Sequence, residues 1–366
     1  MTSKPSNVVL LTNIPSPYNV DLFWNLQNGT DRYTFFPVYT NASEDNRSWT
    51  PKEERMINTT ILNSRVLKIP TAHDYRYIHF SPSIKPTLDH IQPKAVIAWE
   101  YNPAALMALA WCQKHHVRFI HVTEGTLNSE RSLNPVQTWS RKRIISNADA
   151  FIACSSKAKE KLLFWGAEEE KIETALLTVD ITPYLSIHRS PLGGRILYVG
   201  SLAERKGVDL LIQSLPFVQK PFSLHIVGDK EGKEKEELKR LITSLHLEDS
   251  VTWCGYLEGE SLRREYQEAS VFVLPTKEDC FGLVLVEAMA AGVPIVSSKY
   301  ADGAYDVINE KNGSIVDPYD KHRMAEAITF YLNHPYHSDN SLIEKFSYSE
   351  ITAHYYVALD QWFNRL

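Results

Sequence analysis

The pattern of apolar and polar positions divides the chain into two series of short buried strands that alternate with helices. An apolar run of four to six residues that ends in a turn or polar loop predicts a buried strand. Because such strands, separated by helices, are typical of parallel sheets, we expect two doubly wound α/β domains. The strand-like runs lie at residues 8–11, 95–99, 117–122, 150–153, 195–199, 224–227, 251–256, 271–275, 294–297 and 313–316.

The pattern breaks around Pro183 to Gly194, which holds prolines, two adjacent glycines and no periodicity. Domain boundaries fall in such segments. We therefore expect a first domain over residues 1–185 and a second over residues 192–345. The last segment, residues 351–366, carries four aromatic residues at helix-like spacing and predicts a C-terminal helix. Residues 41–58 are polar and charged, and predict a long exposed loop.

Composition narrows the class of protein. The net charge of −5 argues against a general nucleic-acid binder. The four cysteines show no Cys-x-x-Cys spacing, which argues against a disulfide framework and a zinc site and favours a reducing compartment. The polar start predicts no signal peptide, and no apolar run approaches the roughly 18–20 residues of a membrane span. These features predict a cytoplasmic protein.

The most informative stretch, residues 278–292, reads EDCFGLVLVEAMAAG. An acidic pair enters a Phe-Gly turn, and the apolar run after it predicts a buried helix that ends at Gly292. Glu287 lies one turn into this helix, where a carboxylate is costly unless it is paired. It either forms a structural ion pair with a distant Lys or Arg, or binds a ligand together with Asp279, eight residues earlier.

Between these two carboxylates lie the amides of Phe281, Gly282 and Leu283, at the positive end of the predicted helix. That end of a helix is a ready anion site. Carboxylates bind hydroxyls and amides bind phosphate, so the stretch favours a nucleotide sugar as the ligand.

This stretch resembles the Glu-x7-Glu motif of the retaining GT-B glycosyltransferases of glycosyltransferase family 4. Asp279 stands at the first Glu of the motif and Glu287 at the second. A loop at residues 200–207 is similar to the family's Gly-Arg-Leu-x-x-x-Lys-Gly segment: Lys206 matches, whereas Ser201 replaces the Arg, and Arg205 could supply the missing charge.

The resemblance implies a GT-B architecture, in which two doubly wound Rossmann-like domains face a cleft and the C-terminal helix crosses back onto the first domain. It also implies transfer of a hexosyl or N-acetylhexosaminyl group, with retention, from a nucleoside-diphosphate sugar to a sugar hydroxyl in glycan or polysaccharide synthesis. UDP is favoured as the nucleotide. No cofactor and no metal are expected, since no Asp-x-Asp pair occurs and Lys206 with the amides would stand in for the ion.

The same resemblance implies roles for individual residues. Lys206, Asp279 and Glu124 are the expected catalytic residues. The first loop would face the acceptor through Pro17, Tyr18 and Asn19, together with Glu124 after the strand at 117–122. The expected donor-binding residues are Ser201, Arg205, Lys206, Gly228, Tyr256, Asp279, Cys280, Phe281, Gly282, Leu283 and Glu287.

Several alternatives stay open. Residues 130–145 carry a charge of +3 with interleaved aromatic and aliphatic residues, so they could dock on an anionic membrane surface or be an ordinary surface helix. Glu124 could be a plain loop carboxylate. A sugar-nucleotide epimerase or phosphorylase on the same fold, or a non-catalytic sugar-nucleotide-binding subunit, are the alternative functions.

Overall fold

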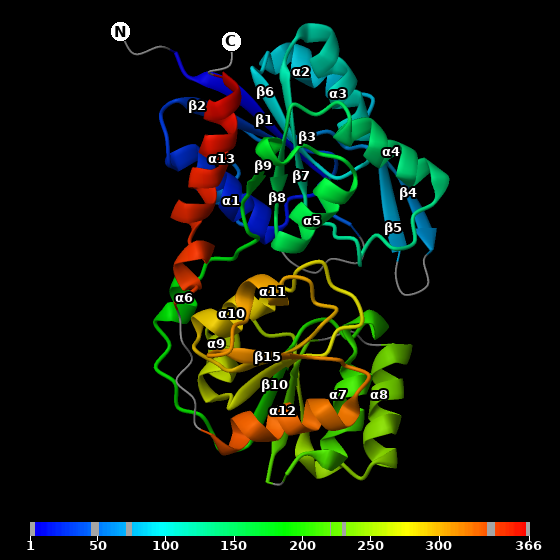
Figure 1. Cartoon of the computed structure of the whole chain (residues 1–366), viewed down its shortest axis with the longest axis vertical. Coiled ribbons are helices and arrows are strands. Elements are labelled where there is room, and N and C mark those ends of the chain that lie inside the picture. Colours follow the sequence, from blue (N-terminus) through cyan, green and yellow to red (C-terminus); the bar gives the residue numbers. More distant parts are fainter. Residues whose placement is uncertain are drawn as a thin grey trace. The chain divides into compact units, whose positions relative to one another are not determined.

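The computed structural model of the chain describes residues 4–44, 51–70, 75–219, 221–228, 232–334 and 341–363. The chain divides into two compact units, one formed by residues 1–180 with 347–366 and the other by residues 181–346 (Figure 1). The expected boundary lay between residues 185 and 192. The division instead falls between Asp180 and Ile181, because helix α6 (Thr182–Leu185) packs on helix α10 (Val284–Ala290) of the second unit.

The first unit is built on a parallel sheet of seven strands, in the order β3-β2-β1-β6-β7-β8-β9. The apolar run at 95–99 forms β6, all of which is buried, as expected for a central strand of a doubly wound sheet. The order reverses between β1 and β6, the point at which such sheets usually bind ligands. The strands are β1 (Ser6–Thr12), β2 (Tyr33–Tyr39), β3 (Thr60–Ile61), β6 (Ala95–Trp99), β7 (Arg118–Thr123), β8 (Ala150–Ala153) and β9 (Ile172–Thr174).

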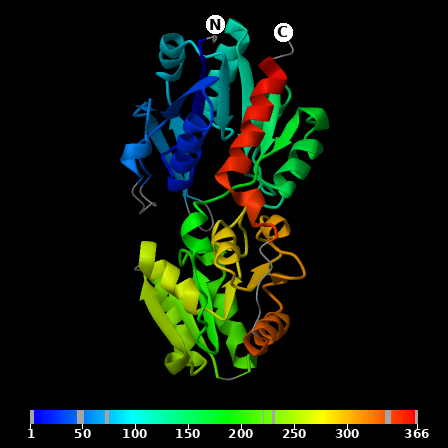
Figure 2. The same ribbon diagram turned by 90° about the vertical axis from the view of Figure 1, so that its left-hand side faces the viewer.

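Helices cover both faces of this sheet (Figures 1 and 2). A separate antiparallel hairpin of β4 (Arg65–Pro70) and β5 (Tyr75–Phe80) was not expected from the sequence. Part of the predicted loop at 41–58 lies outside the described residues, and a short 3-10 helix, η1 (Glu53–Arg55), occupies its second half. The other helices of the unit are α1 (Pro17–Asn28), α2 (Ile84–Ile91), α3 (Pro103–His115), α4 (Pro135–Ile145), α5 (Ser156–Phe164), η2 (Glu169–Lys171) and α13 (Tyr348–Phe363).

The C-terminal helix α13 belongs to the first unit. It starts three residues before the expected position, and residues 364–366 lie outside the described part of the chain. It packs on α1, β8 and β9. The Tyr356 hydroxyl donates to the carbonyl of Leu26 at 2.8 Å, and the Tyr355 ring stacks on Trp99 with centroids 6.2 Å apart. The aromatic residues Tyr355 and Tyr356 therefore fix the helix to this sheet.

The second unit has a parallel sheet of six strands in the order β12-β11-β10-β13-β14-β15. All strands expected in this half are present, and β15 lies at one edge of the sheet. The strands are β10 (Arg195–Val199), β11 (Ser223–Val227), β12 (Val251–Gly255), β13 (Val271–Leu274), β14 (Ile295–Ser298) and β15 (Gly313–Val316). The helices besides α6 and α10 are η3 (Glu204–Lys206), α7 (Val208–Ser214), η4 (Leu215–Phe217), α8 (Lys233–Ser244), η5 (Glu248–Ser250), α9 (Gly259–Glu268), α11 (Ala304–Val307), α12 (Lys321–Asn333) and η6 (Ile343–Phe346).

The chain enters the second unit at α6 and leaves it through η6, and both of these segments pack on α10. Leu285, Val286 and Phe346 are fully buried, which explains the absence of a polar face on the helix. Helix α10 is thus held between the sheet and the two segments at which the chain passes between units.

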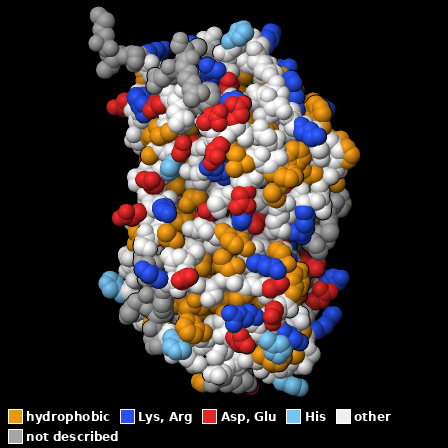
Figure 3. Space-filling model, viewed as in Figure 1, with side chains coloured by type: hydrophobic (Ala, Val, Ile, Leu, Met, Phe, Trp, Pro, Cys, Tyr) orange, Lys and Arg blue, Asp and Glu red, His pale blue; other side chains and the backbone are white. Residues whose placement is uncertain are grey.

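The surface carries both charge signs. Basic and acidic side chains are interspersed over the face shown in Figure 3, in keeping with the small net charge of the chain. Among the residues that the structure describes, no helix combines the length and the apolar character needed to span a membrane.

Candidate functional site

The loop that carries Lys206 is fixed against the loop that leads into α10. The carbonyl of Arg205 accepts hydrogen bonds from the N–H of Lys277 at 2.7 Å and from the Thr276 hydroxyl at 2.9 Å. Gly207 follows with φ of +69°, and a Cβ atom here would overlap the carbonyl oxygen of Pro275. Only glycine combines this backbone conformation with so close an approach.

Lys206 and Asp279 form an ion pair across the two loops. Burial alone would raise the pKa of the Asp279 carboxyl, but the adjacent Lys206 ammonium outweighs burial and lowers it. Arg205 adds to this lowering, and its guanidinium donates to the carbonyl of Glu278 at 3.4 Å. The structure therefore brings together Arg205, Lys206 and Asp279, and Asp279 is ionised at neutral pH.

The turn between Asp279 and α10 leaves backbone donors available. Gly282 adopts φ of +86°, and a Cβ atom there would lie 2.8 Å from the Leu274 side chain. The N–H of Phe281 points to the Asp279 carboxylate at 3.4 Å, whereas those of Gly282 and Leu283 donate to no backbone acceptor in the described part of the chain. Free amides at the start of a helix are the expected feature of an anion site.

Glu287 is bound by two tyrosine hydroxyls. The Tyr266 hydroxyl donates to Glu287 Oε2 at 2.8 Å, and Tyr184 of α6 also donates to this carboxylate. Within the described ranges, no Lys or Arg lies at ion-pair distance from Glu287. The alternative that Glu287 forms a structural ion pair with a distant Lys or Arg is therefore wrong for these residues. Burial raises the pKa of Glu287 to about 7, against the opposite effect of the two hydroxyls.

The other expected donor residues occupy the ends of the same strands. Ser201 is exposed after β10, and its carbonyl accepts from the buried Tyr198 hydroxyl at 2.7 Å. Gly228 directly follows β11, and its N–H donates to the carbonyl of Gly255 at 2.8 Å. Tyr256, next along the chain, is 55% exposed and its hydroxyl lies 3.2 Å from Glu258. Cys280 is partly buried beside Asp279 in the turn.

The expected acceptor residues lie in the first unit. Pro17 and Tyr18 start α1 and are partly exposed, whereas Asn19 is only 4% exposed. Asn19 lines a narrow pocket with Trp99 and Tyr355. Of the three expected residues, only Pro17 and Tyr18 therefore reach the surface. Glu124 follows β7 and is partly buried, at the start of a loop with an extensive polar network.

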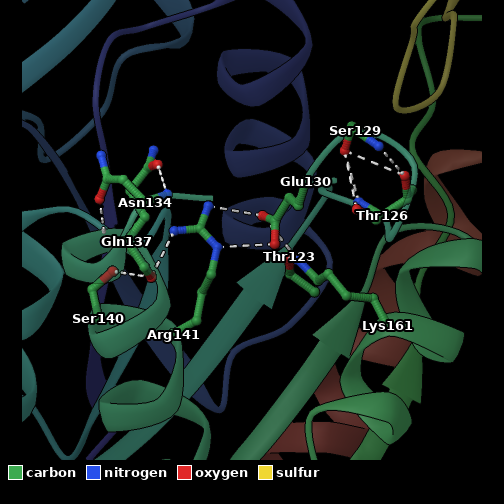
Figure 4. A network of polar contacts seen from close by, with 9 residues as sticks. All are labelled: Thr123, Thr126, Ser129, Glu130, Asn134, Gln137, Ser140, Arg141 and Lys161. Carbon is green, nitrogen blue, oxygen red and sulfur yellow. Dashed lines mark hydrogen bonds and ion pairs between the residues drawn. The ribbon is translucent and has the colours of Figure 1, made fainter. Parts of the chain in front are cut away.

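That network holds one fully buried charge, Lys161, and two partly buried ones, Glu130 and Arg141 (Figure 4). Arg141 of α4 binds Glu130 with two hydrogen bonds, of 2.9 and 3.0 Å. Lys161, fully buried, lies 2.6 Å from the Thr123 hydroxyl and 3.3 Å from Glu130. Burial alone would raise the pKa of Glu130, but the two cations lower it. The network fixes the loop that contains Glu124.

The same network changes the interpretation of residues 130–145. Arg141 was one of the cations expected at a membrane surface, but its guanidinium is turned inward and paired. The residues of this segment that remain exposed on α4 are Pro135, Val136, Trp139, Lys142 and Arg143. Any contact of α4 with a membrane therefore has two basic side chains available rather than three.

Three residues that shape the site were missed by the sequence reasoning. The Thr276 hydroxyl ties the two loops together, and Tyr184 and Tyr266 bind Glu287. Tyr184 lies in the segment predicted to hold the domain boundary, and no role was predicted for Tyr266. The only sequence feature that pointed to Thr276 is its place directly after the predicted strand at 271–275. The sequence holds no feature that points to Tyr184 or Tyr266.

Two family models match the chain, each largely within one unit. The family model of glycosyl transferases group 1 matches residues 193–347, and that of Glycosyltransferase Family 4 matches residues 42–182. A D-inositol 3-phosphate glycosyltransferase of Pseudarthrobacter chlorophenolicus is 25% identical over 208 residues, which are 53% of this chain and 50% of that protein. Two other curated relatives are matched over 32% and 55% of their own length.

Two solved structures share the fold over nearly the whole chain. Sucrose-phosphate synthase from Thermosynechococcus elongatus superposes with a TM-score of 0.76 at 18% identity and covers 99% of this chain and 100% of its own. The Anabaena protein HepE in complex with UDP superposes with a TM-score of 0.77 at 16% identity and covers 97% and 100%.

The two Rossmann-like sheets, of seven and six parallel strands, have the GT-B fold that these solved structures share. The two family models together match more than half of the residues, and the chain belongs to the group 1 and family 4 glycosyltransferases that they describe.

Proposed function

We propose that the protein transfers a hexosyl or N-acetylhexosaminyl group from a UDP-sugar to a sugar hydroxyl of a glycan or glycolipid, with retention of configuration. The observation that carries this proposal is the Lys206–Asp279 ion pair beside the free amides of Gly282 and Leu283. A cation and two N–H donors suit a diphosphate, and a neighbouring carboxylate suits a sugar hydroxyl.

Each of these groups has a role in the proposed reaction. Asp279 accepts a hydrogen bond from a hydroxyl of the transferred sugar. The Lys206 ammonium, which pairs with Asp279, also binds the diphosphate. Glu287 accepts hydrogen bonds from the ribose hydroxyls. The bond between the anomeric carbon and the phosphate oxygen breaks, the acceptor oxygen bonds on the same face, and the phosphate takes the acceptor proton. No nucleophile of the protein is required.

The diphosphate carries the charge that develops as this bond breaks. Removal of one preorganised donor from such a site typically costs about 10²- to 10³-fold in kcat. Lys206, Arg205 and the turn amides supply this stabilisation without a divalent ion. We therefore propose that turnover is independent of metal. UDP is proposed because the similar HepE structure holds UDP and because this nucleotide is frequent in the family.

The test is a thermal-shift panel of UDP-, GDP- and ADP-sugars, followed by a turnover assay with glycan acceptors in excess EDTA. A true donor at 100 times its Kd should stabilise the protein by about 2.7 kcal/mol. Lys206→Ala should lose most of that shift for the sugar nucleotide while retaining the fold. Failure of every nucleotide sugar to shift the wild type, or a strict need for Mg²⁺ or Mn²⁺, would contradict the proposal. Epimerised or hydrolysed donor without acceptor would favour the alternative activity.

A further inference from the structure

A second group of reactive side chains lies in the second unit, apart from the ion-paired loops. It consists of His225 on strand β11, Cys254 on the edge strand β12 and Glu265 on helix α9. The Nδ1 atom of His225 lies 2.8 Å from Glu265 Oε2 and 3.7 Å from Cys254 Sγ. All three potential ligand atoms lie within 4.8 Å of one another, on partly buried side chains.

A local irregularity of the sheet produces this convergence. Ile226 of β11 pairs with Trp253, but the next residue, Val227, pairs with Gly255. Cys254 is therefore an extra residue in β12. Such bulges bend a strand and redirect a side chain, and they are common next to functional sites.

The arrangement does not fit a Cys-His-Glu catalytic triad. In a triad the nucleophile and the carboxylate contact opposite nitrogens of the imidazole, so that one activates and the other orients the ring. Here Cys254 and Glu265 both approach the same atom, Nδ1 of His225. Three potential ligand atoms within 4.8 Å of one another are instead compatible with a metal site.

The distances suit a small tetrahedral ion. With zinc bonds of about 2.0 Å to nitrogen or oxygen and 2.3 Å to sulfur, tetrahedral N–S and N–O edges are about 3.5 and 3.3 Å long. The observed N–S separation of 3.7 Å is within about 0.2 Å of this, and the N–O separation of 2.8 Å requires an opening of about 0.5 Å. The partial exposure of His225 and Glu265, 14% and 16%, leaves room for water as the fourth ligand.

We propose that His225, Cys254 and Glu265 bind a divalent transition-metal ion, for which Zn²⁺ is the best match to one imidazole, one thiolate and one carboxylate. Cys254 loses its thiol proton to solvent when the ion binds. Arg195 is the one cation seen beside the carboxylate, with Nη1 3.5 Å from Glu265 Oε2, in the described ranges. It also pairs closely with Glu268, which keeps its charge balanced when Glu265 turns to the metal.

The ion would have a structural role. Cys254 directly precedes Gly255 and Tyr256, and His225 lies three residues before Gly228. A metal that ties β11 to β12 would fix the strand ends from which two loops of the donor site begin. It takes no part in the transfer reaction, so this inference does not depend on the proposed function.

The test uses the whole protein after treatment with a chelator and gel filtration. Zinc binding is measured by competition with a chromogenic chelator, and Co²⁺ is added separately as a spectroscopic probe. We expect one ion per chain, an increase in Tm, and a thiolate-to-cobalt charge-transfer band in the near ultraviolet. Cys254→Ser should abolish the band and weaken zinc binding by at least the about 10- to 100-fold that loss of an outer-shell partner costs.

Cys280→Ser is the matched control, because Cys280 is the other partly exposed thiol and should leave the band intact. Glu265→Gln serves as a second ligand variant, and circular dichroism checks that each variant is folded. Absence of stoichiometric zinc binding by the wild type would overturn the proposal. So would a zinc affinity or a cobalt band that is unchanged in Cys254→Ser, since the ion would then lie elsewhere.

Discussion

Replacement of Glu287 by Gln removes a partly buried charge that, among the described residues, has two tyrosine hydroxyls and no cation as partners. The size of the effect follows from the pKa, which burial raises from 4.5 to about 7. A shift of this size corresponds to about 3 kcal/mol by which the ionised carboxylate destabilises the folded state, at about 1.4 kcal/mol per pKa unit. Glutamine keeps the shape of the side chain and has no charge to desolvate.

The sign of the pH dependence follows from the same values. Between pH 4.5 and 7 the folded protein holds a proton on Glu287 that the unfolded chain has lost. The stability contribution of the protonated carboxyl is therefore fully present below pH 4.5 and is lost as pH rises to 7 and above. Glu287→Gln should be close to the wild type in stability near pH 4.5 and more stable by up to about 3 kcal/mol at pH 8.

Donor binding should change in the opposite direction. A carboxylate can accept from two ribose hydroxyls, whereas the amide of glutamine keeps only one acceptor oxygen. Loss of one charged hydrogen bond costs about 1.5–3 kcal/mol, so the variant should lose about 10- to 150-fold in kcat/KM. The assays are denaturant unfolding of the ligand-free protein at pH 5 and pH 8, and initial rates with the nucleotide sugar. If Glu287→Gln instead destabilises the protein by about 3–5 kcal/mol at pH 8 with unchanged affinity, Glu287 has a structural role and the reasoning fails.

Three further predictions concern the loops and α4. Lys206→Met should lower kcat about 10²- to 10³-fold and destabilise the protein, and adding Asp279→Asn should restore the free energy of unfolding but not the activity; recovery of both would assign the pair to folding alone. Gly207→Ala should cost at least about 1–3 kcal/mol in denaturant unfolding, because of its positive φ and the clash with Pro275, and a neutral effect would show that the loop can move. Lys142→Ala with Arg143→Ala should reduce co-sedimentation with anionic vesicles, at about 1 kcal/mol per charge, and wild-type protein that stays in the supernatant at low salt would rule out this contact.

Much of the fold could be predicted because strands buried on both faces leave a strong signal. The run at 95–99 forms β6, and the run at 271–275 forms β13, the strand that precedes the stretch at 278–292. The hairpin β4–β5 gave no such signal, because Leu67 and Phe80 are 60% and 52% exposed and the segment lacks a buried apolar run. Local patterns predict elements that bury a face and miss those that do not.

The candidate site could be predicted only as far as one continuous stretch extends. The sequence placed Asp279 and Glu287 at a helix start, and Lys206 in a second loop. It held nothing about the hydroxyls that bind Glu287, since Tyr184 and Tyr266 are 103 and 21 positions away and reach it only through packing of α6 and α9. The orientation of the Arg205 side chain likewise depends on a distant group, the carbonyl of Glu278, and not on residues adjacent to Arg205 in the sequence.

Helix α10 connects the candidate donor site with the two segments through which the chain passes between the units. It carries Glu287, and it is also the surface on which both α6 and η6 pack. Tyr184, which contacts Glu287, lies four residues after the first unit ends. A sugar nucleotide that draws Glu287 away from Tyr184 would therefore act on the entry segment directly, and any displacement of α10 would reach the exit segment through Phe346. A change at Glu287 therefore has a route of direct packing contacts to both segments through which the chain passes from one unit to the other.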